Sequence, residues 1–169
     1  LAVVTNVDRE HMSFYGTMDR LLDAYVSFIN AIPFYGRAIL CADCQRVTSL
    51  LDRVNKRFVT YGTRPECDLA ARDICYRGLR TDFEVLHRGV SLGRVEIAML
   101  GRHVALNALA ALAIGLELGI DFSTAAHALA SFGGIQRRFE IKGEQGGVTV
   151  VDDYGHHPTE IRATLAAAR

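Results

Sequence analysis

The segment VDDYGHHPTE, residues 151–160, places many side chains that carry charge or exchange protons in one short turn. Two carboxylates, a phenol and two imidazoles stand within six residues, from Asp152 to His157. Three further polar clusters read TNVDREH (5–11), GRHVALN (101–107) and QRRFE (136–140). Arginine matches phosphate oxygens in charge and geometry, while carboxylate and imidazole groups can hold a cation. Together the clusters indicate a site for a polyanion and a divalent metal.

Each cluster also has a purely structural explanation. Asn6 and His11 could simply cap and close a loop, and Asn107 could be an exposed amide on a helix surface. Arg137 and Arg138 could be solvated charges of a linker. Each of the four clusters taken alone is therefore a weak signal.

Capping offers the simplest structural explanation for the two aspartates of residues 151–160. Asp152 and Asp153 could satisfy the N-terminus of a helix beginning at Pro158, whose dipole Thr159 and Glu160 would favour. This explains one acid, but not two acids, a tyrosine and two histidines together. Either Asp152 or His157 could cap or brace the turn while the others bind a ligand.

Composition limits the class of protein. The 169 residues include 19 basic and 19 acidic side chains, so no net field favours nucleic acid as a partner. No apolar run approaches the roughly 20 residues that a membrane span needs, and no signal segment opens the chain. The chain begins LAVVTNV, inside a strand-like run and without an initiating Met, so we expect a piece of a longer protein.

The four cysteines are Cys41, Cys44, Cys67 and Cys75. The first two have CxxC spacing, but no second CxxC completes a zinc ribbon. Cys41 ends the apolar run AILCA, so we expect it to be a small buried side chain rather than a reactive thiol. Free thiols without a signal segment favour a reducing, cytoplasmic location.

The polar clusters need secondary structure to position them. Strand-like runs alternate with helical patterns over the first third of the chain, at residues 1–7, 18–32, 36–42, 44–54 and 57–62. This alternation predicts parallel strands with helices packed on the sheet faces. Ligands bind at the carboxyl ends of strands in such sheets, which is where the first and last polar clusters fall.

Antiparallel strands and further helices are predicted for the rest of the chain. We expect a meander over 68–99, helices over 103–120 and 123–132 with Ser123 as the N-cap, a hairpin around GEQGG, and a helix over 158–169. The two glycines of FGG mark a domain boundary and a candidate hinge at 133–134. Residues 1–134 would form one unit, and 135–169 the opening β-β-α of a second that is too short to bury its own core.

These segments resemble the Mur ligase family. The residues that carry the resemblance are, in order, TNVDREHM, FYGRAILC, GRHVALNALAALAIGLELGID, FGGIQRRFE and VVDDYGHHPTEIRATLAAAR. The resemblance spans the chain, but only part of such an enzyme. It implies an α/β fold: part of a P-loop-type parallel sheet with helices and a small antiparallel sheet (1–134), then the first β-β-α of a Rossmann-like C-terminal domain (135–169).

The resemblance also implies a reaction. It points to an ATP-dependent ligase of peptidoglycan biosynthesis that uses Mg²⁺ and joins L-alanine to UDP-N-acetylmuramate through an acyl phosphate. Magnesium and basic groups would stabilise charge on the transferred phosphoryl group. Two alternatives remain: a family member that reattaches murein tripeptide, and a non-catalytic module on the same scaffold.

Three positions match nucleotide-binding positions of the family. By resemblance, Asn107 contacts the adenine, Asp153 lies near the ATP ribose, and Arg138 reaches the nucleotide phosphates from the junction between the domains and assists catalysis. Val104 stands where the family usually has an asparagine.

Three more positions match the metal and the amino-acid pocket. By resemblance, His11 ligates a magnesium ion and so takes part in catalysis, while Tyr154 and His156 line the amino-acid pocket. Ser13 stands where the family usually has an aspartate. No GxxxxGK[ST] sequence occurs, so we predict that the chain alone has no ligase activity and binds ATP weakly at most.

Overall fold

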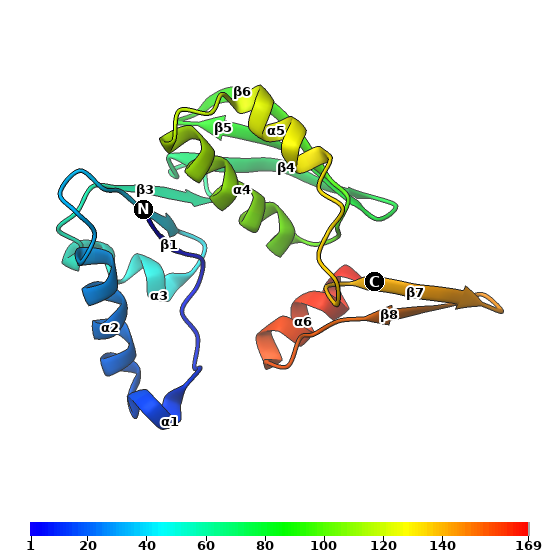
Figure 1. Ribbon diagram of the computed structural model, residues 1–169, viewed down its shortest axis with the longest axis horizontal. Coiled ribbons are helices and arrows are strands. Elements are labelled where there is room, and N and C mark those ends of the chain that lie inside the picture. The colour runs from blue at the N-terminus through cyan, green and yellow to red at the C-terminus, as the bar shows by residue number, and fades with distance from the viewer. Residues whose placement is uncertain (169) are drawn as a thin grey trace.

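A six-stranded sheet forms the centre of the computed structural model, which describes residues 1–168 (Figure 1). Its strands follow the order of the chain: β1 (Ala2–Val4), β2 (Ala38–Cys41), β3 (Phe58–Gly62), β4 (Leu69–Arg77), β5 (Arg80–His87) and β6 (Val90–Ile97). Strands β1 to β4 pair in parallel, and β4, β5 and β6 pair antiparallel. The alternation of strands and helices therefore gives the parallel arrangement that the sequence predicts.

Helices cover both faces of this sheet. They are α1 (Met12–Tyr15), α2 (Met18–Asn30), α3 (Gln45–Thr48), a 3₁₀ turn η1 (Leu51–Arg53), α4 (Arg102–Glu117) and α5 (Phe122–Ala130). Strand β2 separates two cores: Ala38 and Leu40 point toward α2 and α3, while Ile39 and Cys41 point toward α4. All four β2 residues are buried, as expected for a strand covered on both faces. The structural role predicted for Cys41 is confirmed, since only 2% of its surface is exposed.

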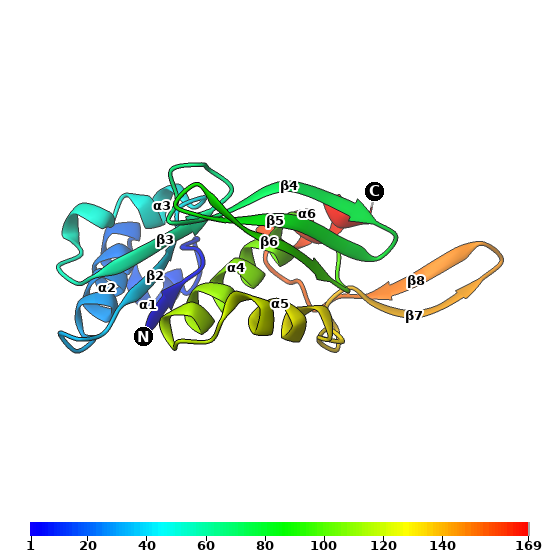
Figure 2. The same cartoon turned by 90° about the horizontal axis from the view of Figure 1, so that it is seen from above.

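The meander extends the parallel sheet instead of forming a sheet of its own (Figure 2). β4 meets β3 only at its first two residues, where Leu69 lies opposite Tyr61 and Ala70 opposite Gly62. β4 then continues alone and pairs with β5 along most of its length. The predicted parallel and antiparallel parts are both present, joined through β4.

Helix α5 packs on β6 through a close contact. A Cβ atom at Gly93, where φ is +133°, would lie 3.0 Å from the ring of Phe122. Glycine is thus needed at this position both for the backbone conformation and for the approach of the ring.

Two local predictions are wrong. Asp121, not Ser123, caps α5, because its carboxylate accepts the Thr124 N–H at 2.9 Å and the Thr124 hydroxyl at 2.6 Å. The predicted helix over 44–54 is broken into α3 and η1. Hydroxyls of Thr48 and Ser49 bond to carbonyls three residues earlier, which competes with regular helical bonding.

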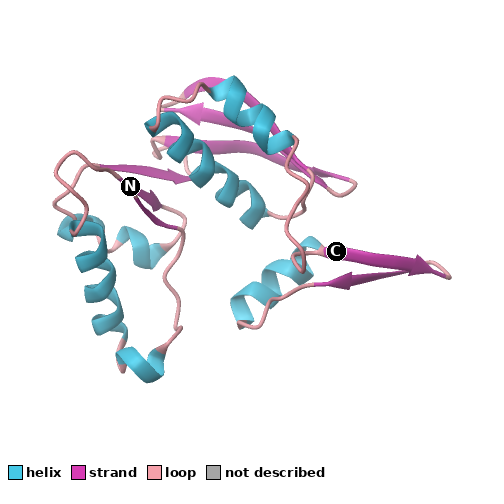
Figure 3. Cartoon of the chain, in the orientation of Figure 1, coloured by secondary structure: helices cyan, strands magenta, loops and turns pink. Residues whose placement is uncertain are grey.

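The last part of the chain forms the predicted β-β-α unit (Figure 3). Strands β7 (Glu140–Gln145) and β8 (Val148–Asp152) make a separate hairpin, and α6 (Pro158–Ala167) follows. The hairpin projects away from the main sheet, whereas α6 contacts α4. No helix within residues 1–168 is long and apolar enough to cross a membrane.

Candidate functional site

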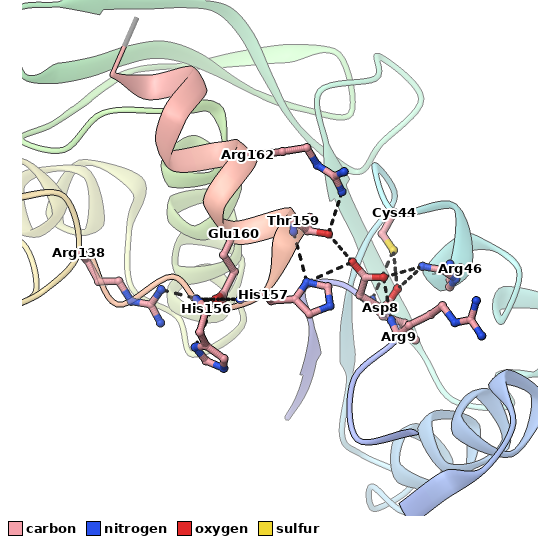
Figure 4. Close-up of polar contacts among 11 residues, drawn as sticks. Asp8, Arg9, Cys44, Arg46, Arg138, His156, His157, Thr159, Glu160 and Arg162 are labelled. Atoms are coloured by element: carbon pink, nitrogen blue, oxygen red, sulfur yellow. Dashed lines mark hydrogen bonds and ion pairs between the residues drawn. The ribbon is translucent and has the colours of Figure 1, made fainter. Parts of the chain in front are cut away.

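The loop after β1 and the first turn of α6 lie against each other. The Thr159 hydroxyl donates a hydrogen bond to Asp8 Oδ2 at 2.6 Å, although the two residues are 151 positions apart (Figure 4). Nδ1 of His157 lies 3.8 Å from the same oxygen. The structure therefore joins the first and last polar clusters of the sequence.

Asp8 is fixed from its own side of this contact. Its Oδ1 accepts the Arg9 backbone N–H at 2.7 Å and Arg46 Nη1 at 3.2 Å. Arg46 also donates to the Val7 carbonyl at 3.2 Å, so one guanidinium holds both the backbone of the loop after β1 and the carboxylate. The Thr159 hydroxyl, followed by the Arg9 N–H, lowers the pKa of Asp8. Asp8 is thus held as a carboxylate.

Asp153 organises the turn after β8. One carboxylate oxygen accepts the Phe139 N–H at 2.9 Å, and the other accepts the Gly155 N–H at 2.7 Å. A Cβ atom on Gly155 would lie 2.8 Å from Asp153 Oδ1, so only glycine allows this approach. The carboxylate proposed to lie near the ribose thus also ties the turn to the start of the hairpin.

Tyr154 lies among three cationic or titratable side chains. The Arg137 and Arg138 guanidinium carbons are 4.7 and 5.7 Å from its ring centroid, and the His156 ring meets it edge-on at 5.4 Å. Such arrangements are favourable through the ring quadrupole. Half of the Tyr154 surface and 65% of the His156 side chain remain exposed, so both are accessible to a ligand.

The helix N-terminus is capped by His157, so the capping role suggested for Asp152 and Asp153 is wrong. His157 Nδ1 accepts the Thr159 N–H at 3.3 Å, and the Glu160 carboxylate accepts the His157 N–H at 3.3 Å. This reciprocal pair is a capping box. The aspartates stand too far before the helix to reach its free N–H groups, whereas His157 directly precedes Pro158.

Helix α4 presents one face toward this turn. Desolvation by surrounding protein atoms lowers the pKa of His103 although the residue keeps exposed surface, while the nearby Asp153 carboxylate raises it and Arg138 lowers it. Asn107 is one helical turn beyond His103, so the two share a face, and the Asn107 side chain is exposed. Val104 faces the core, with 5% of its surface exposed. The predicted nucleotide residues Asp153 and Arg138 thus gather beside α4, on which Asn107 lies.

His11, the predicted magnesium ligand, lies in the loop between β1 and α1. It directly precedes α1 with a left-handed backbone (φ 56°), its side chain is exposed, and it makes no capping hydrogen bond. Among residues 1–168, no three His, Cys, Asp or Glu side chains gather closely enough to hold a metal ion. Because Mg²⁺ usually takes only one or two protein ligands beside water and phosphate oxygens, the role of His11 as a magnesium ligand stays a prediction.

The sequence did not reveal a polar cluster at the ends of β2 and β3. A cavity of about 420 Å³ opens there, lined in part by Asp43, Thr63 and Arg102. The Asp43 side chain is only 6% exposed, and it accepts the N–H and hydroxyl of Thr63 at 2.9 Å each and Arg102 Nη2 at 2.6 Å. Arg102 begins α4, so Asp43 fixes that helix to the sheet. The position of Asp43 just past a buried strand was the one available signal.

Comparison with known proteins places these features in a family. Residues 1–115 match the Mur ligase middle domain, and residues 137–169 match the Mur ligase glutamate ligase domain. The UDP-N-acetylmuramate–L-alanine ligase of Geobacter sp. strain M21 is 51% identical over 169 residues, which cover 100% of this chain and 37% of that protein. The chain thus spans little more than a third of this relative.

Solved structures agree with this assignment. The UDP-N-acetylmuramate-alanine ligase MurC of Thermotoga maritima matches with a TM-score of 0.81 and 27% identity, over 98% of this chain and 37% of that one. The MurF ligase of Thermotoga maritima, solved in complex with ADP, has the same fold, with a TM-score of 0.82 and 24% identity over 98% and 38% of the two chains. The chain therefore belongs to the Mur ligase family.

Proposed function

We propose that this chain is part of an ATP-dependent ligase that joins L-alanine to UDP-N-acetylmuramate in peptidoglycan biosynthesis. Identity of about half, sustained over the whole chain, to proteins of that name supports the choice of substrates. The observation that carries the proposal is the contact of Asp8 with Thr159, which brings the turn with Tyr154 and His156 to the strand-end loop. Soluble substrates of this kind fit the predicted cytoplasmic location.

The nucleotide would lie along α4 and the junction before β7. Asn107 offers an exposed amide to the adenine, and Asp153 retains free lone pairs on both carboxylate oxygens for ribose hydroxyls. Arg138 would donate to phosphate oxygens, where its charge stabilises the phosphoryl group as it moves. ATP supplies the phosphoryl group that converts the substrate carboxylate into an acyl phosphate.

The amino acid would bind at the turn after β8. Tyr154 and His156 would border the space for the alanine, whose uncharged amino group attacks the acyl carbon. A C–N bond forms, phosphate leaves with the C–O electron pair, and the nitrogen releases a proton that the departing phosphate can accept. The acyl carbon, the nitrogen and the phosphate must be held together for this step, which explains a site shared by two parts of the chain.

We further propose His11 as one ligand of a magnesium ion. Its exposed imidazole follows a strand end, where an ion would meet phosphate oxygens. Water and phosphate oxygens would supply the remaining ligands, as is usual for Mg²⁺ in proteins.

Phosphate release by the longer protein that contains this chain tests the proposal. We expect release with ATP, UDP-N-acetylmuramate and L-alanine together, and little when L-alanine is omitted or replaced by murein tripeptide. Release with tripeptide alone would instead support the tripeptide ligase, and no release with either would support the non-catalytic module. A GKT-type loop encoded upstream of Leu1 would independently favour an enzyme.

Arg138→Ala in the same protein tests the nucleotide site. We expect turnover to fall about 10²–10³-fold, as for other preorganised groups that stabilise transition-state charge, with an unchanged melting temperature. Arg72→Ala is the control, because Arg72 pairs with Glu84 on the exposed side of the meander. Normal turnover with a lower melting temperature would make Arg138 a structural linker residue.

A further inference from the structure

We infer that Asp8 and Thr159 form a bridge that positions the turn of residues 152–157 for the amino-acid substrate. Their hydrogen bond, 2.6 Å long, links the loop after β1 to the first turn of α6. Asp8 and Thr159 thus have a positioning role rather than a direct contact with the substrate.

The Asp8 side of the bridge is rigid. Arg46 and the Arg9 N–H hold one carboxylate oxygen, which leaves Oδ2 directed at α6 (Figure 4). The first turn of a helix favours a negative charge, because its free N–H groups carry partial positive charge. Asp8 supplies that charge to α6 from another part of the chain.

The Thr159 side has a defined direction. Arg162 Nη2 donates to the Thr159 oxygen at 3.4 Å, so the hydroxyl accepts from Arg162 and donates its own proton to Asp8. His157 contributes less to the bridge while it is neutral, since its Nδ1 accepts the Thr159 N–H and has no proton to offer Asp8.

The bridge continues from α6 into the proposed substrate site. Glu160, the next residue, accepts the N–H of His156 at 3.2 Å and that of His157 at 3.3 Å, and lies 4.0 Å from Arg138. A shift of the α6 N-terminus therefore moves the backbone that carries Tyr154 and His156. Asp8 and Thr159 act on the substrate through this backbone and do not touch it.

The test compares Thr159→Val with Thr159→Ser in the longer protein. Valine keeps the shape of threonine and removes the donor, whereas serine keeps the donor. The kinetic readout rests on the proposed function. We expect Thr159→Val to raise KM for L-alanine about tenfold and to change KM for ATP less than twofold. Thr159→Ser should have both KM values of the unmodified protein. Asp8→Ala should have the same effect, and the double variant should be no worse than either single one.

Amide hydrogen exchange without substrates provides a readout independent of ligase activity. We expect faster exchange over residues 153–160 in Thr159→Val and normal exchange in Thr159→Ser. Thr124→Val is the matched control, because the Thr124 hydroxyl also donates to an aspartate at 2.6 Å, but locally, to Asp121, the residue that caps α5. It should leave residues 153–160 unchanged.

The outcomes separate the two proposals. Unchanged exchange in Thr159→Val, or fully additive effects of Asp8→Ala and Thr159→Val, would overturn the bridge. A different result would be faster exchange in Thr159→Val while the unmodified protein has no alanine-dependent activity. That result would retain the bridge as an interdomain contact, but would overturn both its substrate role and the proposed function.

Discussion

Replacing the buried Asp43 by alanine should cost far more stability than replacing an exposed aspartate in an ion pair of equal length. Asp43 and Asp23 each lie 2.6 Å from an arginine, but their side chains are 6% and 61% exposed. Only Asp43 additionally accepts two hydrogen bonds from Thr63. The two substitutions therefore differ mainly in how deeply the carboxylate is buried and in how many hydrogen-bond donors lose their acceptor.

The magnitude follows from those partners. Removing the Asp43 carboxylate leaves the Thr63 N–H and hydroxyl without their acceptor, and hydrogen bonds to charged groups contribute about 1.5–3 kcal/mol. The Arg102 side chain is 57% exposed, so water can hydrate its charge once the carboxylate is removed. The loss of unfolding free energy should therefore stay below the ~3–5 kcal/mol typical of breaking a fully buried ion pair. We expect Asp43→Ala to lower the free energy of unfolding by about 2–4 kcal/mol, and Asp23→Ala by less than about 1 kcal/mol.

Urea unfolding followed by circular dichroism measures both variants. Equal slopes with a lower midpoint for Asp43→Ala would show a change in stability alone. If the two variants lose the same free energy within about 0.5 kcal/mol, the assignment of Asp43 as the residue that fixes α4 to the sheet is refuted.

Three further substitutions test single contacts. Gly155→Ala should displace the Asp153 carboxylate, so that the amides of residues 139 and 155 exchange hydrogen at least tenfold faster by NMR, and unchanged exchange would contradict the close approach. The pKa of Asp8 is lower in the folded chain than its ordinary 3.8, so its stabilising contribution is complete above that value and is lost as the pH falls through the folded pKa. The difference in unfolding free energy between the unmodified chain and Asp8→Asn should therefore shrink on acidification below about pH 4. The charged or titratable groups that face Asp8 are Arg46 and His157. Tyr61→Phe should be neutral or stabilising by up to about 1 kcal/mol in thermal unfolding, since the buried Tyr61 hydroxyl has no hydrogen-bond partner among residues 1–168; a loss above 1 kcal/mol would reveal one.

Regular elements and their polar ends were predictable from the sequence. The Ala/Leu-rich pattern predicts a helix over 103–120, and α4 runs from Arg102 to Glu117, with Gly119 in the left-handed conformation just beyond. Hydrophobic periodicity and glycine positions fix such elements locally. The same holds for the hairpin around GEQGG, where Gly146 and Gly147 both have positive φ.

Contacts between distant residues were not predictable in this way. Nothing in the local pattern of Asp8 or Thr159 indicates that they meet, because their contact depends on how the β-β-α unit packs against the sheet. The choice of cap could not be made from residue type alone, because Asp121 and Ser123 are both good caps and only the structure shows that the Asp121 carboxylate accepts the Thr124 N–H. The residue roles carried over from the Mur ligase family, from His11 to His156, and the boundary near residue 134 remain predictions.

The arrangement of strands in the main sheet has a consequence for the order of folding. β4, β5 and β6 are joined by two-residue turns, Gly78–Leu79 and Arg88–Gly89, and hairpins of this kind form in about 1–10 μs. β1, β2 and β3 pair only across helical connections, which require longer loops to close first.

During synthesis, however, the parallel strands leave the ribosome before the meander and α4 that cover them. Ile39 and Cys41 of the apolar β2 segment AILC are buried against the core to which α4 contributes. This face of β2 therefore stays exposed until α4, which begins some 60 residues later in the chain, has been synthesised. We expect nascent chains that stop before Arg102 to bind chaperones and to aggregate, and chains extended past Gly119 to become resistant to protease.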